Sequence, residues 1–231
     1  MTTPEQRFAI VNEYLGSGDP GENGSSVWFI GIEEAAGWKS QDEVERVRDK
    51  WYGSEGGKVK KDRGKVYPWI ANIVCASMET APSDDWRNNL FRKGSKVFVA
   101  NLFPLGKRNT AVWDETYKEL FGYGSQDLTK YKAKVQTTRF PYLLTRWNEC
   151  RPKATVCFGT SCLEDFQDHL FQDKLNFESC EFYMKCNEKK RILITQHPSS
   201  RHWNNDKKGP EKLLVIQQQL VKWGVTLPWC Q

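Results

Sequence analysis

The sequence predicts an α/β protein with a three-layer α/β/α arrangement around a central, mainly parallel four-stranded sheet. Short apolar runs alternate along the chain with segments of helical periodicity. The apolar runs are nearly continuous instead of alternating with polar residues, and each leads directly into small or polar residues. Strands that helices cover on both faces have this composition, and such strands belong to parallel sheets.

Four apolar runs are the predicted strands. They are SSVWFIGI (25–32), KVFVANLF (96–103), KATVCFG (153–159) and RILITQ (191–196). A fifth segment, ESCEFYMK (178–185), is predicted to be an extra strand or a hairpin arm that leads into the last run.

Helical periodicity fills most of the chain between these runs. The first predicted helix has Pro4 in its first turn and an apolar stripe of Phe8, Val11 and Leu15. Helices are predicted at 4–15, 41–52, 67–78, 139–149, 161–171 and 210–223. Segments 53–65, 122–127 and 204–210 are rich in Gly and polar residues and are predicted to be loops.

Length and composition favour a single domain over residues 1–231, because 39% hydrophobic residues can supply a core of that size. A net charge of +5 is compatible with a polyanionic partner. The chain has no run of about 18 apolar residues, so we expect a cytoplasmic monomer with no membrane contact. Its seven cysteines include no C-x-x-C pair, which predicts reduced thiols and no metal.

The residues that follow the predicted strands are the informative ones, because ligands of open parallel sheets bind beyond the carboxyl ends of the strands. The four ends carry Gly31-Ile32-Glu33-Glu34-Ala35, Asn101, Gly159-Thr160-Ser161 and His197-Pro198-Ser199-Ser200. Carboxylates, an amide, hydroxyl groups and an imidazole are therefore expected to converge on one edge of the sheet.

This set of motifs resembles the uracil-DNA glycosylase superfamily. Gly31-Ile32-Glu33 is similar to the family's first motif, Gly-x-(Asp/Asn), and His197-Pro198-Ser199 is similar to the start of the second. Asn101 in VANLF and the turn Gly159-Thr160-Ser161 are similar to elements that the family places between them. GKVYPWIANI (64–73) resembles the segment whose aromatic residue stacks on the extruded base, and order and spacing agree over residues 26–203.

The resemblance implies a monofunctional DNA glycosylase that needs no cofactor. Breaking an N-glycosidic bond builds positive charge on the sugar and negative charge on the departing base. Glu33 is the predicted group that orients water and stabilises the sugar cation, and Glu34 is either a second acid or a solvated loop charge. His197 is predicted to donate from a neutral imidazole to the pyrimidine O2; the alternative is a strand cap that bonds a backbone carbonyl.

Three further residues are predicted to bind the base. Asn101 would hold its Watson–Crick edge, or else be a turn residue before Pro104. Tyr67 would stack on it, or else belong to the core, and Trp51, Tyr52 and Trp69 are rivals for the stacking role. Ile32, inside the first motif, is placed with this group.

Ala35 is the predicted specificity residue. Uracil-specific members of the family follow the catalytic Asp with Pro-Tyr, and that Tyr packs against C5 of the base. Here the matching positions are Glu34 and Ala35, so the resemblance implies open space beside C5.

Contacts to DNA are expected from three loops. The loop after His197 supplies bulk and charge for a wedge that helps to extrude the base, in the residues Ser199, Ser200, Arg201 and Trp203; His202 is either part of it or simply exposed. Lys60 and Lys61 would hold phosphates, or else belong to a solvated loop. Thr160 and Ser161 would bind a phosphate at the predicted helix N-terminus.

The function predicted from the sequence is excision of a pyrimidine with a substituent at C5. One candidate substrate is glucosylated 5-hydroxymethylcytosine in phage DNA, whose excision would abort phage replication. The alternatives are uracil excision in base excision repair and a catalytically silent DNA-binding module.

Overall fold

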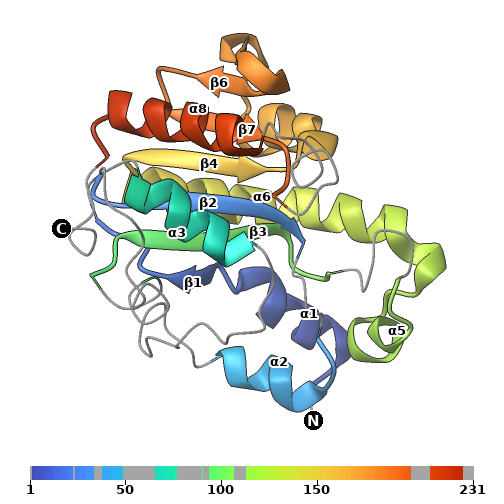
Figure 1. The fold of residues 1–231 in the computed structure, drawn as a ribbon. Helices are drawn as coiled ribbons and strands as arrows, with labels where there is room; N and C mark the ends of the chain where they lie inside the picture. Colours follow the sequence, from blue (N-terminus) through green and yellow to red (C-terminus); the bar gives the residue numbers. More distant parts are fainter. Residues whose placement is uncertain are drawn as a thin grey trace.

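A seven-stranded sheet runs through the centre of the molecule, in the order β1-β3-β2-β4-β7-β6-β5 (Figure 1). The computed structural model describes residues 2–22, 24–33, 38–48, 66–76, 90, 94–106, 113–198 and 209–225. The predicted four-stranded sheet is thus the middle of a larger one.

The four middle strands are parallel and coincide with the predicted apolar runs. They are β3 (Val97–Phe103), β2 (Val27–Glu33), β4 (Ala154–Phe158) and β7 (Ile192–Thr195). Every residue of β4 and β7 is buried, as expected for strands that helices cover on both faces. The predicted α/β class and its mainly parallel sheet are confirmed.

Three short antiparallel strands extend the sheet at its two edges. β1 (Gly16–Gly18) pairs with β3, β6 (Lys185–Asn187) pairs with β7, and β5 (Glu178–Ser179) pairs with β6. β5 and β6 form a hairpin that begins in the segment predicted as an extra strand or hairpin arm, 178–185, and extends two residues beyond it. β1 was not predicted, because its sequence GSG has no apolar pattern and pairing with β3 alone defines it.

Helices cover both faces of the sheet and give the three layers visible in Figure 1. α3 (Val66–Ala76) and α8 (Gly209–Lys222) cover one face, where Ile70, Val74 and Ile216 pack with Phe29 and Val156. α1 (Pro4–Glu13) and α6 (Leu128–Cys150) cover the other. We call these the α3/α8 face and the α1/α6 face.

Shorter helices complete the described chain. α2 (Gln41–Arg48) and α5 (Thr116–Phe121) both pack against α1. Single 3₁₀ turns occur at η1 (Ser125–Asp127), η2 (Thr160–Cys162), η4 (Lys174–Asn176) and η5 (Glu181–Tyr183). None of the helices in the described segments is both long and apolar enough to cross a membrane.

Two predicted helices differ from those observed. α6 begins at Leu128 instead of residue 139. Tyr131 and Val135 are buried and extend the apolar stripe of this helix toward its N-terminus, although the residues around them are polar. The predicted helix over 161–171 is the 3₁₀ turn η2, followed by a π-helix, η3 (Asp165–Leu170). The first turn of this segment therefore has 3₁₀ instead of α-helical geometry.

Candidate active site

The register of the four parallel strands brings one residue from each into a row across the sheet. Gly31 is paired with Asn101 on one side, β4 lies on its other side, and Phe158 of β4 is paired with Thr195 of β7. Paired residues of neighbouring strands project to the same face. The row is therefore Asn101, Gly31, Phe158 and Thr195, close to the carboxyl ends of the strands and on the α3/α8 face.

Gly31 leaves room in this row for the Asn101 side chain. A Cβ at position 31 would lie 2.5 Å from Asn101 Oδ1, far closer than two such atoms approach. The Asn101 side-chain amide therefore lies over the backbone of β2, the strand that carries the first motif. Any side chain at position 31 would displace it.

Ile32 points to the opposite face. A Cβ on Gly159 would lie 2.2 Å from Ile32 Cδ1, so the Ile32 side chain lies directly against this glycine. Ile32 also packs on the apolar cluster of the α1/α6 face. The structure does not bring Ile32 together with the Asn101 side chain. The structure gives Ile32 packing contacts on the α1/α6 face, because successive residues of a strand project to opposite faces, and its base-binding role stays a prediction.

His197 lies two residues beyond β7 and is partly buried. Its ring contacts Phe158 edge to face, with ring centroids 6.3 Å apart, and Phe158 in turn stacks on Phe29 at 5.8 Å. Burial lowers the pKa of His197 below its ordinary value of 6.5. The imidazole is therefore neutral at pH 7 and able to donate from one nitrogen while it accepts at the other.

Phe158 was not selected from the sequence, although it supports the histidine ring. It is the last residue of a strand that is buried throughout, and its ring is 1% exposed. The available signal was its position, one residue before the Gly159 turn. The buried Phe158 ring packs against the ring of His197, which follows the neighbouring strand β7.

Glu33 is the last residue of β2 and is paired with Phe103 of β3. β2 and β7 flank β4, so the backbones that carry Glu33 and His197 are two strand spacings, about 10 Å, apart. Between them β4 ends at Phe158, and the amide of the next residue, Gly159, donates to Thr195 O at 2.7 Å. The residue that follows this strand, between the predicted acid and the predicted imidazole, thus has no side chain.

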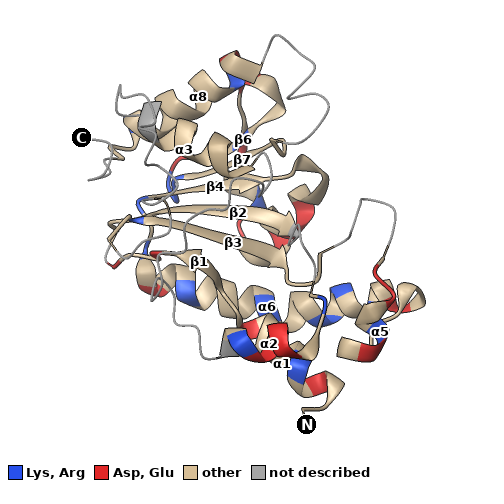
Figure 2. Ribbon diagram, turned by 60° about the horizontal axis from the view of Figure 1, so that its bottom comes forward, with Lys and Arg blue, Asp and Glu red and all other residues tan. Residues whose placement is uncertain are grey.

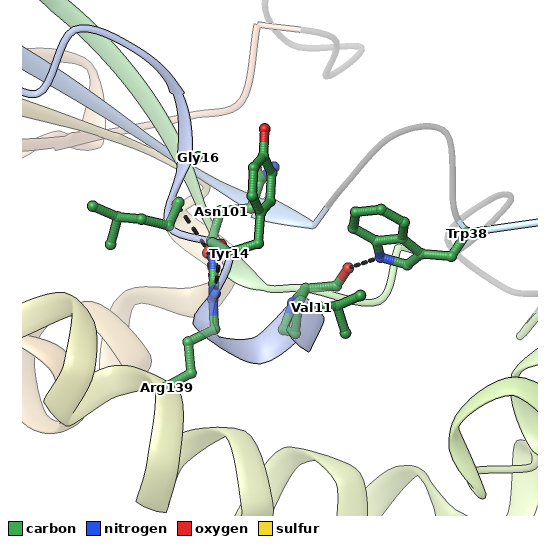
Figure 3. Close-up of a pocket in the computed structure, with 8 residues that line it drawn as sticks. Val11, Tyr14, Gly16, Trp38, Asn101 and Arg139 are labelled. Carbon is green, nitrogen blue, oxygen red and sulfur yellow. Dashed lines mark hydrogen bonds between the residues drawn. The ribbon is translucent and has the colours of Figure 1, made fainter. Parts of the chain in front are cut away.

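Asn101 is held from the α1/α6 side by Arg139, which is 2% exposed. Arg139 Nε and one terminal nitrogen donate to Asn101 O at 3.0 and 2.8 Å, and the other terminal nitrogen donates to Tyr14 O (Figure 3). That second terminal nitrogen also donates to Asn12 O. Sequence analysis missed this residue, because a buried arginine on an amphipathic helix has no distinct local pattern. Arg139 thus fixes the backbone of β3 at Asn101, the residue that carries the amide side chain.

Trp38 fixes the chain on the far side of the first motif. Its indole N–H donates to Pro104 O at 2.8 Å, and its ring packs edge to face on Tyr14 with centroids 6.2 Å apart. Trp38 and Tyr14 line a pocket that Asn101 and Arg139 also border (Figure 3). Trp38 is therefore held by contacts with two other segments of the chain.

Tyr67 lies in the first turn of α3, which begins at the carboxyl edge of the sheet (Figure 1). It is partly buried and, like Trp69, packs on the apolar cluster of the α3/α8 face. The structure thus places Tyr67 on the same face as Asn101, and it also gives Tyr67 the core contacts of the alternative interpretation.

Thr160 and Ser161 follow β4 at the same edge and lie at the start of a helical segment, as predicted. Its first turn is the 3₁₀ turn η2, in which the Cys162 amide donates back to Gly159 O at 3.0 Å, and the segment continues without a break through residues 163–164 into η3. The phosphate-binding role of these two residues stays a prediction. Ser161 is exposed and Thr160 is partly buried, so what they offer a phosphate is hydroxyl groups.

Lys212, in the first turn of α8, is a further polar residue at this edge. It is 5% exposed, and its Nζ donates to Gln196 Oε1 at 3.0 Å, next to His197. This bond ties the start of α8 to the end of β7. The remaining predicted site residues lie outside the described residues: Glu34, Ala35, Lys60, Lys61, Ser199, Ser200, Arg201, His202 and Trp203, as do the rivals Trp51 and Tyr52.

Charges of both signs are mixed on the helices of the α1/α6 face (Figure 2). α2 has Asp42 and Glu43 in its first turn, and α1 has Glu5. This part of the described surface has no uniform basic character of the kind that long DNA-binding faces carry. The sheet edge is thus the better candidate for the functional surface.

The fold and this edge define a class: an α/β/α protein whose ligand site lies at the carboxyl ends of adjacent parallel strands. The chain matches the family model of the uracil DNA glycosylase superfamily over residues 46–221. The protein therefore belongs to the uracil-DNA glycosylase superfamily, whose members are generally DNA glycosylases. A search of curated proteins found no significant match.

Proposed function

We propose that the protein is a monofunctional DNA glycosylase that hydrolyses the N-glycosidic bond of a pyrimidine substituted at C5. The observation that carries this proposal is the arrangement at the sheet edge. Asn101, Glu33 and His197 come from three of the four parallel strands, and glycines stand between them at positions 31 and 159. The glycines let the side chains of Asn101 and Ile32 lie against the sheet, and recognition of a planar base needs polar groups gathered in this way at one edge.

In the proposed reaction, water attacks C1′ of the sugar as the bond from C1′ to the base breaks. The bonding electrons leave with the base, so the sugar becomes cationic and the base anionic in the transition state. The Glu33 carboxylate orients the water, stabilises the cation and accepts the proton that the water loses. His197 donates a hydrogen bond to the pyrimidine O2, where negative charge develops.

The burial of His197 supports this assignment. A cationic imidazole would be the stronger donor to the base anion, but a neutral one still donates a hydrogen bond and leaves the protein without a buried charge when no base is present. The edge-on contact with Phe158 holds the ring in one plane. Asn101 would recognise the Watson–Crick edge through its paired amide donor and acceptor.

The substrate class rests on position 35. In uracil-specific members of the family that the motifs resemble, an aromatic ring after the first motif packs against C5 of the base. This chain has Ala35 at the matching position. Glucosylated 5-hydroxymethylcytosine of phage DNA is the substrate we propose, since its bulk requires an open C5 side. Excision from phage DNA would leave abasic sites that stop replication.

Matched duplexes with a single uracil, thymine, 5-hydroxymethylcytosine or glucosylated 5-hydroxymethylcytosine test this proposal. Abasic sites should form in the glucosylated duplex. The Ala35→Tyr variant should lose that activity while it still binds DNA, because an overfilled pocket excludes the substrate. Excision of uracil alone by the natural protein would replace the proposal with uracil repair, which the superfamily match also supports. No abasic sites in any duplex would indicate a DNA-binding module.

A further inference from the structure

The turn of the β5–β6 hairpin lies at the same edge of the sheet as His197. Lys185, at the start of β6, is paired with Ile194 of β7 in antiparallel register. Residues that precede Lys185 therefore lie toward the carboxyl end of β7, and His197 lies beyond that same end. From the spacing of neighbouring strands, the turn and His197 are on the order of 10 Å apart.

This turn has a backbone conformation that its sequence does not favour. The Met184 amide donates to Glu181 O at 3.1 Å, so Phe182 and Tyr183 are its two central residues. Both have positive φ, 53° and 60°. Hairpin turns with two such residues strongly prefer Asn-Gly, because a side chain with a Cβ is strained there. Two aromatic residues at these positions therefore cost stability.

The two rings have different surroundings. Phe182 packs on the apolar cluster of the α3/α8 face, and it anchors the turn to the body of the protein. Tyr183 is 85% exposed. The hairpin thus holds a bare aromatic ring at a fixed place on the edge of the sheet, and folding alone explains neither its exposure nor its strain.

Charge near the turn favours one kind of ligand. Glu178 and Glu181 are both exposed near it, and Lys185 beside it donates to Ser179 Oγ at 2.6 Å. The net charge of these three residues is negative, which disfavours a phosphate at this point. An aromatic ring instead offers a flat surface on which any nucleobase can stack, whatever its sequence. Such a base would have to be unstacked from its neighbours, as bases are beside an extruded nucleotide or in a single strand.

We propose that Tyr183 is a DNA contact that stacks on an unpaired nucleobase close to the target nucleotide. This inference rests on the proposed function for the presence of a target at the edge, and it adds a second contact on the β7 side. With bases 3.4 Å apart along a strand, the contacted base is within about three nucleotides of the target.

The test uses the full-length protein and a fluorescent duplex that contains a stable abasic analogue, so that binding is measured without turnover. Tyr183→Asn should bind this DNA about tenfold more weakly, since it removes the stacking surface. The same variant should unfold at a higher temperature than the natural protein, because Asn tolerates positive φ. A gain in stability together with a loss of affinity is not expected of a merely structural residue.

Two further variants control the result. Tyr183→Phe keeps the ring and should bind like the natural protein. Leu175→Asn changes another exposed apolar residue, 95% exposed and ahead of β5, and should also leave affinity unchanged. Natural affinity in Tyr183→Asn, or an equal loss in Leu175→Asn, would overturn the inference. A failure of the proposed function would appear instead as absent excision by the natural protein, which this binding measurement does not use.

Discussion

At the scale of single residues, the protonation state of His197 follows from where its ring lies. Two residues past β7 and against Phe158, the imidazole is partly withdrawn from water, and this burial alone lowers its pKa. A donor that is neutral before the reaction can serve a base that becomes anionic during it. The same burial means that protonation of His197 at low pH destabilises the folded protein.

We expect the stability of the protein to fall as the pH drops below about 6.5, the pKa of an unfolded histidine. Below that value the unfolded chain binds a proton that folded His197 resists, so protonation favours unfolding until the lower folded pKa is also passed. Urea unfolding at pH 7.5 and pH 5.5 measures the effect. His197→Gln should lose less stability than the natural protein over the same interval; an equal loss in both would exclude His197 as the cause.

Glu33→Gln should lower the rate of base excision by orders of magnitude and leave DNA binding intact. The carboxylate acts on charge and on a proton that arise only in the transition state, so its loss appears in the rate and not in the affinity. Single-turnover excision and equilibrium binding to the same duplex separate the two quantities. Glu34→Gln is the matched neighbour: should it be the slow variant while Glu33→Gln is normal, the acid has been assigned to the wrong residue.

At the scale of elements, the end of β3 depends on α6. Arg139 reaches from this helix to carbonyl oxygens of β3 and of the C-terminal end of α1, and the Asn101 carbonyl accepts two of its bonds. The guanidinium replaces water for several backbone groups that would otherwise be buried without partners. One side chain thereby joins three elements next to the candidate base-binding amide.

Arg139→Lys should destabilise the protein by about 2–3 kcal/mol, because one ammonium cannot replace a planar fork of donors to several carbonyls. The free energy of unfolding in urea measures this loss. Arg146→Lys, on the same helix, is the control: Arg146 pairs with Glu149 at the surface, and such pairs contribute between 0 and about 1 kcal/mol. Similar small losses in both variants would show that the Arg139 network does not stabilise the fold.

At the scale of the whole molecule, the sheet edge is a composite of distant parts of the chain. Asn12 and Arg139, joined by a hydrogen bond, are 127 positions apart in sequence. Lys212 links α8 to Gln196. The residues predicted to form the wedge, 199–203, lie between these two positions in the sequence.

Removal of Arg201 and Trp203 together should slow excision from duplex DNA much more than from single-stranded DNA. Only the duplex requires the target to be unpaired and unstacked, at a cost of a few kcal/mol. Excision rates on the two substrates, each relative to the natural protein, give the comparison. Equal losses on both would assign these side chains to the fold instead of to base extrusion.

The sequence by itself determined the parallel core of the fold and the edge where polar groups gather. Continuous apolar runs report burial on both faces, and that signal is local. β3, β4 and β7 therefore lie within the predicted ranges, β2 extends one residue beyond its range to Glu33, and Asn101 and His197 lie at the predicted edge. The superfamily motifs followed from the residues at the strand ends in the same way.

Only the tertiary structure decided the contacts that support these residues. The face to which Ile32 points, the support of Asn101 by Arg139 and the exposure of Tyr183 all depend on pairings between distant segments. β1 and β5 are too short to carry a pattern of their own, and hydrogen-bond partners leave no trace in local periodicity. The sequence records which residues avoid water, whereas strand register and packing decide which residues meet.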